Sequence, residues 1–205
     1  MKFSENWLRT WVNPKLSSEA LAHTLTMAGL EVEALETLPG DTIFTLKLTP
    51  NRSDCSGLVG IARDVAALTG SALKPLDIPA QAVTLAEQLP VKVDDATGCP
   101  LYCGRLVRGV NAAVITPDWM MQRLENSGLH GISAVVDITN YVMLEMGQPL
   151  HAFDVAKLSG AITVRKARKG EALTLLNEQS VVLDEAVLVI ADDARVLALA
   201  GIMGG

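Results

Sequence analysis

The stretch Ala134–Asp154, AVVDITNYVMLEMGQPLHAFD, crowds polar residues into an apolar run and then turns sharply at Gly147-Gln148-Pro149. An Asp at an N-cap accepts hydrogen bonds from the free amides of the first helical turn. With Asp137 in that position, the pattern predicts a short helix that runs to Glu145 or Met146.

Four side chains in this stretch are candidates for chemistry. Asp137, Thr139 and Asn140 supply short-armed donors and acceptors, and His151 follows the turn as one of only three histidines in the chain. A neutral imidazole can accept from or donate to a water or hydroxyl near pH 7. The alternative for His151 is a hydrogen-bonded structural histidine, and spacing alone leaves both open.

Composition limits the protein class. A chain of 205 residues with 49% hydrophobic content can form one large or two small globular domains. Its apolar runs are broken before the roughly 20 residues needed to span a bilayer, and its start has no signal-peptide core, so we expect a cytoplasmic protein without membrane contact. The net charge of -6 argues against a general basic surface for nucleic acid, so any RNA contact must be local or shared with a partner.

The cysteines indicate neither disulfides nor zinc. Cys55, Cys99 and Cys103 are odd in number, and the Cys99-x3-Cys103 pair lacks a second ligand pair. We expect three reduced thiols and no metal site.

The first part of the chain reads as a small domain of helices and strands. Helical spacing, capping residues and alternation predict its elements in this order: a short helix capped by Ser4 and stopped by Pro14, a helix from Ser17 or Ser18 to Gly29, strands Glu31–Glu36 and Ile43–Leu48, and a helix carrying Leu58 to Leu68 and ended by Gly70.

A polar turn, Thr49–Asp54, lies between the second strand and the third helix. Asn51 and Arg52 in this turn could form a phosphate site. Alternatively, Asp54 at the helix start and Arg52 satisfy the turn and each other.

The second part is predicted to be mostly sheet. Thr116-Pro117-Asp118 predicts a helix with a Thr cap, in which Trp119 and Met120 are core, ending at Gly128. Strands are predicted at Val91–Val93, Tyr102–Val107, Ile162–Arg165, Leu173–Leu176, Val181–Leu183, Val187–Ala191 and Val196–Ala200. The fold class is therefore α+β: an N-terminal domain over residues 1–76, a Pro-containing linker over 77–92, and a mostly β domain over 93–205.

The motif at residues 137–154, DITNYVMLEMGQPLHAFD, resembles a signature of the bacterial phenylalanyl-tRNA synthetase beta subunit, in the part that houses its editing site. Further stretches resemble that subunit in the same order: MKFSENWLRTWVNP at 1–14, TMAGLEVEALE at 26–36, LTPNRSDC at 48–55 and AGIMGG at 200–205. Matches of this length are more specific than a short motif.

The resemblance also implies missing parts. The family normally carries a tRNA-binding module of the oligonucleotide-binding barrel type where this chain has only residues 38–42, LPGDT. The chain is then either a shortened relative or one from which the module was removed deliberately near Pro39-Gly40. In the family the polypeptide continues past Gly205, so we expect a fragment whose editing-type domain is incomplete at its C-terminus.

The resemblance implies that this region contributes to hydrolysis of tyrosine wrongly attached to phenylalanine tRNA, because a synthetic site that binds phenylalanine discriminates only weakly against an added hydroxyl. By resemblance the catalytic group is His151 with Asn140 and Thr139, which place a water and the terminal adenosine against the ester without a protein nucleophile. The Gly201 and Gly204 backbone is the expected substrate-binding loop, although such glycines can also merely close a hairpin.

The sequence departs from the family at two points, and both weaken the assignment of the family's site residues to this chain. His130, a candidate substrate contact, replaces an Arg that many relatives have, so a fixed cation is lost, and the acid that reads the tyrosine hydroxyl in the family lies beyond Gly205. The site in this chain would be half a site.

The family also implies partners. They are phenylalanine tRNA and an alpha subunit, in a heterotetramer of two alpha and two beta subunits, with ATP and magnesium used by the complete enzyme and no cofactor bound by this chain. Exposed strand edges also invite self-association of the chain. The alternative function is a non-catalytic scaffold or engineered folding fragment without activity.

Overall fold

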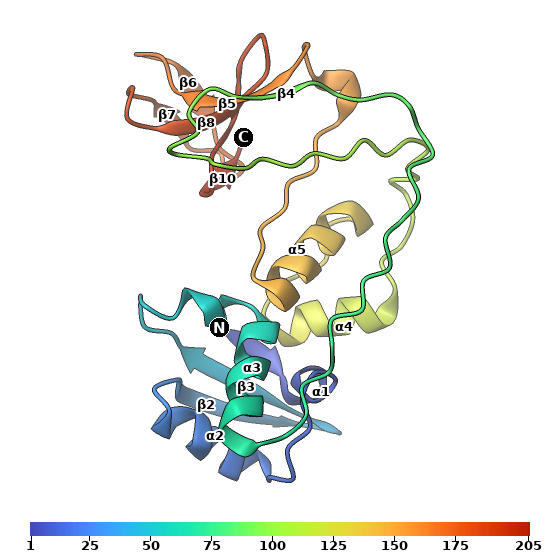
Figure 1. Cartoon of the computed structure of the whole chain (residues 1–205), viewed down its shortest axis with the longest axis vertical. Helices are drawn as coiled ribbons and strands as arrows, with labels where there is room; N and C mark the ends of the chain where they lie inside the picture. Colours follow the sequence, from blue (N-terminus) through green and yellow to red (C-terminus); the bar gives the residue numbers. More distant parts are fainter. The chain divides into compact units, whose positions relative to one another are not determined.

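The computed structural model describes all residues from Met1 to Gly205, which form two compact units. Unit 1 comprises Met1–Pro79 with Asn111–Ala152, and unit 2 comprises Ala80–Val110 with Phe153–Gly205. Both units are drawn in Figure 1. Helices and strands occur together, as the predicted α+β class requires.

Unit 1 is built on a three-stranded antiparallel sheet of order β1-β3-β2. The helices α1, α2 and α3 contribute side chains to one core with this sheet, centred on Phe3, Trp7, Phe44 and Ile61, all almost fully buried. The elements of this unit are β1 (Lys2–Ser4), α1 (Glu5–Arg9), α2 (Ser18–Met27), β2 (Glu31–Leu38), β3 (Asp41–Lys47), the short 3-10 helix η1 (Ser53–Ser56), α3 (Leu58–Thr69), α4 (Asp118–Asn126) and α5 (Ala134–Met146).

Three helix boundaries lie where the sequence predicts them. Ser4 accepts from the Trp7 amide at the start of α1, and Ser17 accepts from the Ala20 amide at the start of α2. Gly70 ends α3 in the left-handed conformation. In the β2–β3 hairpin Leu38 pairs with Asp41, so a two-residue turn closes the point at which the family resemblance implies a missing module.

Two predicted caps are wrong. Thr116 does not cap α4: its hydroxyl donates to the Asp137 carboxylate, and Pro117 takes the cap position without a side-chain bond. Asp137 does not cap α5, because Ser133 accepts from the Val136 amide one turn earlier. Trp119 is also not core, since it is 52% exposed, whereas Met120 is buried as predicted.

Unit 2 holds a five-stranded sheet of order β10-β9-β8-β5-β4 and a two-stranded sheet of β6 and β7. The β4–β5 pair is parallel and the other pairs are antiparallel. Its elements are β4 (Val91–Val93), η2 (Val155–Lys157), β5 (Ile162–Lys166), β6 (Ala172–Thr174), β7 (Ser180–Val182), β8 (Leu188–Ala191), β9 (Val196–Leu199) and β10 (Met203–Gly204). The predicted strand Tyr102–Val107 is wrong, because that segment has no ladder partner.

The packing groups Asn111–Ala152 with the N-terminal part of the chain. The domain boundaries drawn from the sequence, at 76, 92 and 93, stay predictions. No helix combines the length and apolarity that crossing a bilayer demands.

Candidate functional site

The candidate site is organised by α5, whose first turn is anchored by Asp137. This carboxylate is 1% exposed, and it accepts from the Thr116 hydroxyl and, at 2.9 Å, from the Ile132 amide. A buried carboxylate needs such donors, because a charge left unpaired away from water is costly. Asp137 therefore fixes the loop that carries His130 into α5, and His130 itself is exposed.

The last turn of α5 is anchored by Glu145. One of its oxygens, Oε1, accepts from Trp7 Nε1 at 3.1 Å, Trp11 Nε1 at 3.1 Å and the Tyr141 hydroxyl at 3.0 Å. Burial, followed by the nearby Glu145 charge, raises the pKa of Tyr141 to about 12, so this phenol stays protonated and can donate. Arg123 donates to the same phenol oxygen at 2.6 Å.

Aromatic rings surround that arginine. The Arg123 guanidinium carbon lies 5.1 Å from the Trp7 ring centroid, 5.5 Å from that of Trp119 and 5.9 Å from that of Tyr141. Cation–π contacts of this kind favour a fixed position of the charge. Glu145 and Arg123 thus lock α5 to α1 and α4.

Thr139 and Asn140 lie in the middle of α5. Asp137, Tyr141 and Glu145 recur every four residues and share the face that bonds to neighbouring elements, and the two candidates lie off that face. Thr139 Oγ1 donates to the Val136 carbonyl at 2.7 Å, so its lone pairs remain available as acceptors. Asn140 is half-buried.

His151 follows the end of α5 by five residues. The helix ends at Met146, Gly147 caps it with a φ of 73°, and the Gly147 amide donates to the Met143 carbonyl at 2.9 Å. Desolvation lowers the pKa of His151 below its ordinary value of 6.5. The imidazole is therefore mostly neutral at pH 7 and can orient a water as an acceptor.

Gly201 and Gly204 belong to unit 2. Gly201 has a φ of 72° in the turn between β9 and β10, and Gly204 pairs with Ala198 in that hairpin. The structure thus gives both glycines a hairpin role. Thr139, Asn140 and His151 lie on one helix and its following loop, and a common site with the glycines stays a prediction.

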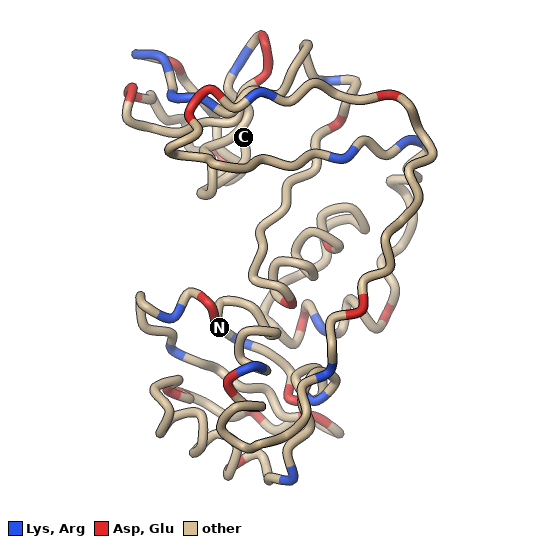
Figure 2. Tube along the Cα trace, in the orientation of Figure 1, with Lys and Arg blue, Asp and Glu red and all other residues tan.

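Basic residues are absent from the segment around the candidate residues. From residue 124 to residue 156 the chain contains no Lys or Arg, and Figure 2 shows the α5 trace without basic residues. A phosphate backbone is gripped chiefly by Lys and Arg. This segment is therefore suited to a neutral or locally bound group rather than to a run of phosphates.

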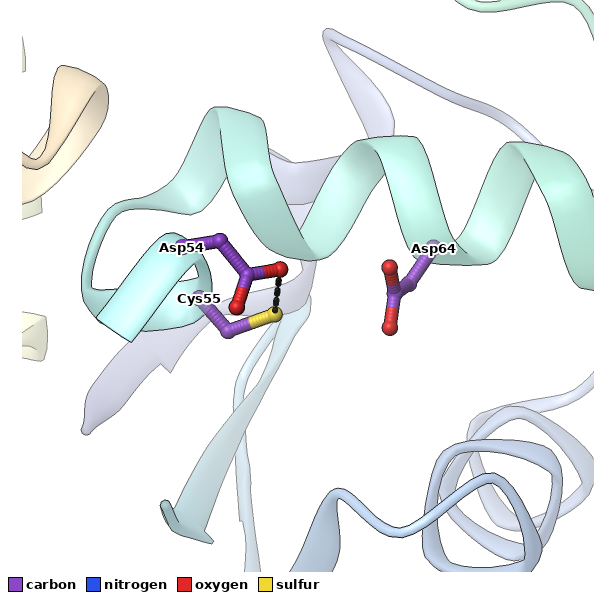
Figure 3. A group of neighbouring side chains, drawn as sticks. All are labelled: Asp54, Cys55 and Asp64. Carbon is purple, nitrogen blue, oxygen red and sulfur yellow. Dashed lines mark hydrogen bonds between the residues drawn. The ribbon is translucent and has the colours of Figure 1, made fainter. Parts of the chain in front are cut away.

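The polar turn before α3 forms an ion-pair cluster. Figure 3 shows Asp54 and Cys55 of η1 and Asp64 of α3 turned toward one another, with ligand-type atoms all within 4.8 Å. Arg52 Nη2 donates to Asp54 at 2.9 Å, to Asp64 at 2.6 Å and to Cys55 Sγ at 3.0 Å.

This arrangement favours the ion-pair interpretation of Arg52 over the phosphate site. The Arg52 hydrogen bonds hold the pKa of Asp54 down at about 2, and desolvation raises the pKa of Cys55 to about 12. The guanidinium already occupies the space between the carboxylates, so the cluster does not fit a magnesium ion.

Comparison with known proteins gives a family. The B3/4 domain family matches residues 98–205, more than half of the chain. The chain is 40% identical over 325 aligned positions to the phenylalanine–tRNA ligase beta subunit of Nitrosospira multiformis, covering 100% of this chain and 41% of the relative. It is 53% identical over 165 residues to the same subunit of Neisseria meningitidis serogroup B, covering 80% of this chain and 21% of the relative.

Length differences accompany these matches. The chain spans about two fifths of the relatives that it matches end to end. The alignment with Nitrosospira has 325 positions against 205 residues here, so about 120 positions have no residue of this chain. The chain is also similar to a solved N-terminal fragment of the phenylalanyl-tRNA synthetase beta subunit from Pyrococcus horikoshii. This match covers 100% of this chain and 62% of the fragment, with 16% identity and a TM-score of 0.46.

Proposed function

The chain belongs to the B3/4 domain family, and from that premise we propose that it contributes to hydrolytic editing of tyrosine attached to phenylalanine tRNA. Its relatives are beta subunits of an aminoacyl-tRNA ligase in protein biosynthesis. We assign the chain the same setting: phenylalanine tRNA as substrate carrier, and an alpha subunit as the partner in a complex of two alpha and two beta subunits. We assign ATP and magnesium to the remainder of that enzyme.

One observation carries the proposal: α5 is locked at both ends and leads through a short turn to a mostly neutral His151. Ester hydrolysis by a bound water needs groups that orient the water and the ester, and fixed groups do so without reorganisation. Asn140 offers both an amide donor and a carbonyl acceptor, and Thr139 offers acceptor lone pairs.

In the proposed mechanism His151 accepts a hydrogen bond from the attacking water. Asn140 and Thr139 bind the hydroxyl and carbonyl groups around the ester. No protein nucleophile is required, because the water attacks the ester directly. Tyrosine and a tRNA with a free terminal hydroxyl are the products.

The test is tyrosine release from tyrosyl-tRNA specific for phenylalanine, with the chain, its His151→Ala variant and a no-protein control. His23→Ala is the matched control, because His23 is an exposed histidine on α2. A positioned acid–base group contributes about 100-fold or more, so we expect His151→Ala to lose that factor while His23→Ala keeps the full rate.

The competing function is a non-catalytic scaffold. It predicts release at the no-protein rate for all three chains, with His151→Ala changing stability alone or nothing. That result would overturn the editing proposal for this chain while leaving its family membership intact.

A further inference from the structure

We propose that Gly57 is a positioning residue for the His151 loop, a role that rests on the proposed editing function. Gly57 lies at the N-terminus of α3, directly after the polar turn and η1. The mechanism above uses no residue of that segment. Its closest neighbour is the C-terminal end of α5, from which the His151 loop leaves.

The contact between the two segments is backbone on backbone. A Cβ atom added at Gly57 would lie 2.2 Å from the Gly147 nitrogen and 2.7 Å from the Gly147 Cα. Gly57 has a φ of -125°, an extended conformation that any residue adopts. Glycine is therefore required here for space and not for backbone conformation.

The surface that Gly57 presents is rigid. A Cβ atom at Gly60 would lie 1.8 Å from the Asp54 carbonyl oxygen, so η1 is packed directly onto the first turn of α3. Arg52 forms ion pairs with Asp54 of η1 and with Asp64 of α3, and it thereby connects the two elements. The segment from Arg52 to Asp64 thus acts as a single support.

The C-terminal end of α5, which contacts this support, has little freedom to move away from Gly57. Glu145 is bonded to Trp7 and Trp11 two residues before Gly147. The C-terminus of α5 also meets the N-terminus of α3, an arrangement in which the helix dipoles attract. The position of Gly147 is consequently set by α1 on one side and by Gly57 on the other.

The segment from Gly147 to His151 is short and stiff. Pro149 has a fixed φ and restricts the residue before it, so a shift of Gly147 is carried along the chain rather than absorbed. An alanine at Gly57 needs the helix end to move by about 1 Å, and a displacement of that size at a catalytic group can cost about 100-fold in rate.

The experiment follows the histidine imidazole signals by NMR in the 205-residue chain labelled at histidine, with His151 assigned by His151→Gln. His23 and His130 serve as internal references. Gly104→Ala is the matched control, because its added Cβ meets only the Val91 side chain, at 3.6 Å.

We expect Gly57→Ala to shift the His151 signals and leave His23 unchanged, with Gly104→Ala shifting neither. In tyrosine release we expect Gly57→Ala to lower kcat by about tenfold or more with KM nearly unchanged, as for a group that acts in the transition state. Unchanged His151 signals in a folded Gly57→Ala chain would overturn the proposal.

A second measurement covers the case in which Gly57→Ala does not fold. In the unsubstituted chain a strong nuclear Overhauser effect is expected between a Gly57 α-proton and the Gly147 amide proton, and its absence would overturn the proposal. Both NMR measurements are independent of catalysis. A chain with no hydrolytic activity but with the His151 shift refutes the editing function and retains the structural dependence of the loop on Gly57.

Discussion

Replacing Glu145 by leucine removes the single oxygen on which three donors converge. Trp7 of α1, Trp11 just after α1 and Tyr141 of α5 all donate to Glu145 Oε1, and the two indole bonds join α5 to the N-terminal segment. Leucine fills similar space but accepts no hydrogen bond. The substitution therefore leaves the two indole N–H groups and one phenol without their partner.

The size of the effect follows from burial. Trp7 is 1% exposed, so water cannot replace its lost acceptor, whereas Trp11 and Tyr141 are only partly buried and regain water. A buried donor left without an acceptor costs about 1–3 kcal/mol, and a hydrogen bond to a charged group contributes about 1.5–3 kcal/mol. We therefore expect Glu145→Leu to lower the unfolding free energy by about 3 kcal/mol. Glu145→Gln keeps one acceptor oxygen and should lose about 1 kcal/mol.

Urea unfolding followed by tryptophan fluorescence measures this loss, because two of the three tryptophans contact Glu145. Glu125→Leu, at an exposed glutamate on α4, is the matched control and should leave the midpoint almost unchanged. A loss below about 0.5 kcal/mol for Glu145→Leu would refute the argument that this oxygen holds α5 in place.

Three further predictions concern other parts of the chain. Hydrogen bonds from Arg165 lower the pKa of Glu171 from 4.5 to about 2, so this carboxylate contributes stability above pH 4.5 that is lost as the pH falls toward 2. Glu171→Gln should therefore flatten the pH dependence of the unfolding free energy between these two pH values. An unchanged slope would contradict this prediction. Iodoacetamide at pH 8 should label exposed Cys103 and spare buried Cys55, whose pKa is raised to about 12, as read by mass spectrometry of the native chain; equal labelling would contradict this. Gly60→Ala should destabilise the chain by about 1–3 kcal/mol in urea unfolding, because its Cβ would overlap a backbone carbonyl, and a neutral result would contradict the packing.

Elements fixed by local chemistry were predictable from the sequence. Ser4, Ser17 and Gly70 act through their own side chain or backbone freedom on the adjacent turn, and the structure confirms all three. The hairpin strands β2 and β3 also lie where the sequence predicts strands, although the burial along them does not alternate residue by residue.

Features fixed by distant residues were not predictable. Thr116 has the sequence context of a cap, yet its hydroxyl bonds to Asp137, which is 21 residues away. Trp119 has the apolar character of a core residue, but only half of it is covered, by Arg123 and Tyr141. No local pattern encodes such pairings, because they depend on how α4 meets α5.

The same distinction between local and distant contacts applies to the candidate site. The motif around Thr139, Asn140 and His151 identifies which residues to test, since their chemistry is legible in the sequence. The contact between Gly57 and Gly147 could not be predicted from the sequence, because the two residues are far apart along the chain and meet only in the folded structure.

The most direct test of the central claim is an NMR titration of the chain with an adenosine that carries tyrosine on its 3′ position through an amide, which cannot be hydrolysed. The account predicts chemical-shift changes at Thr139, Asn140 and His151, because all three would contact one ligand. Changes confined to other residues, or none at saturating ligand, would contradict the assignment of these residues to an editing site.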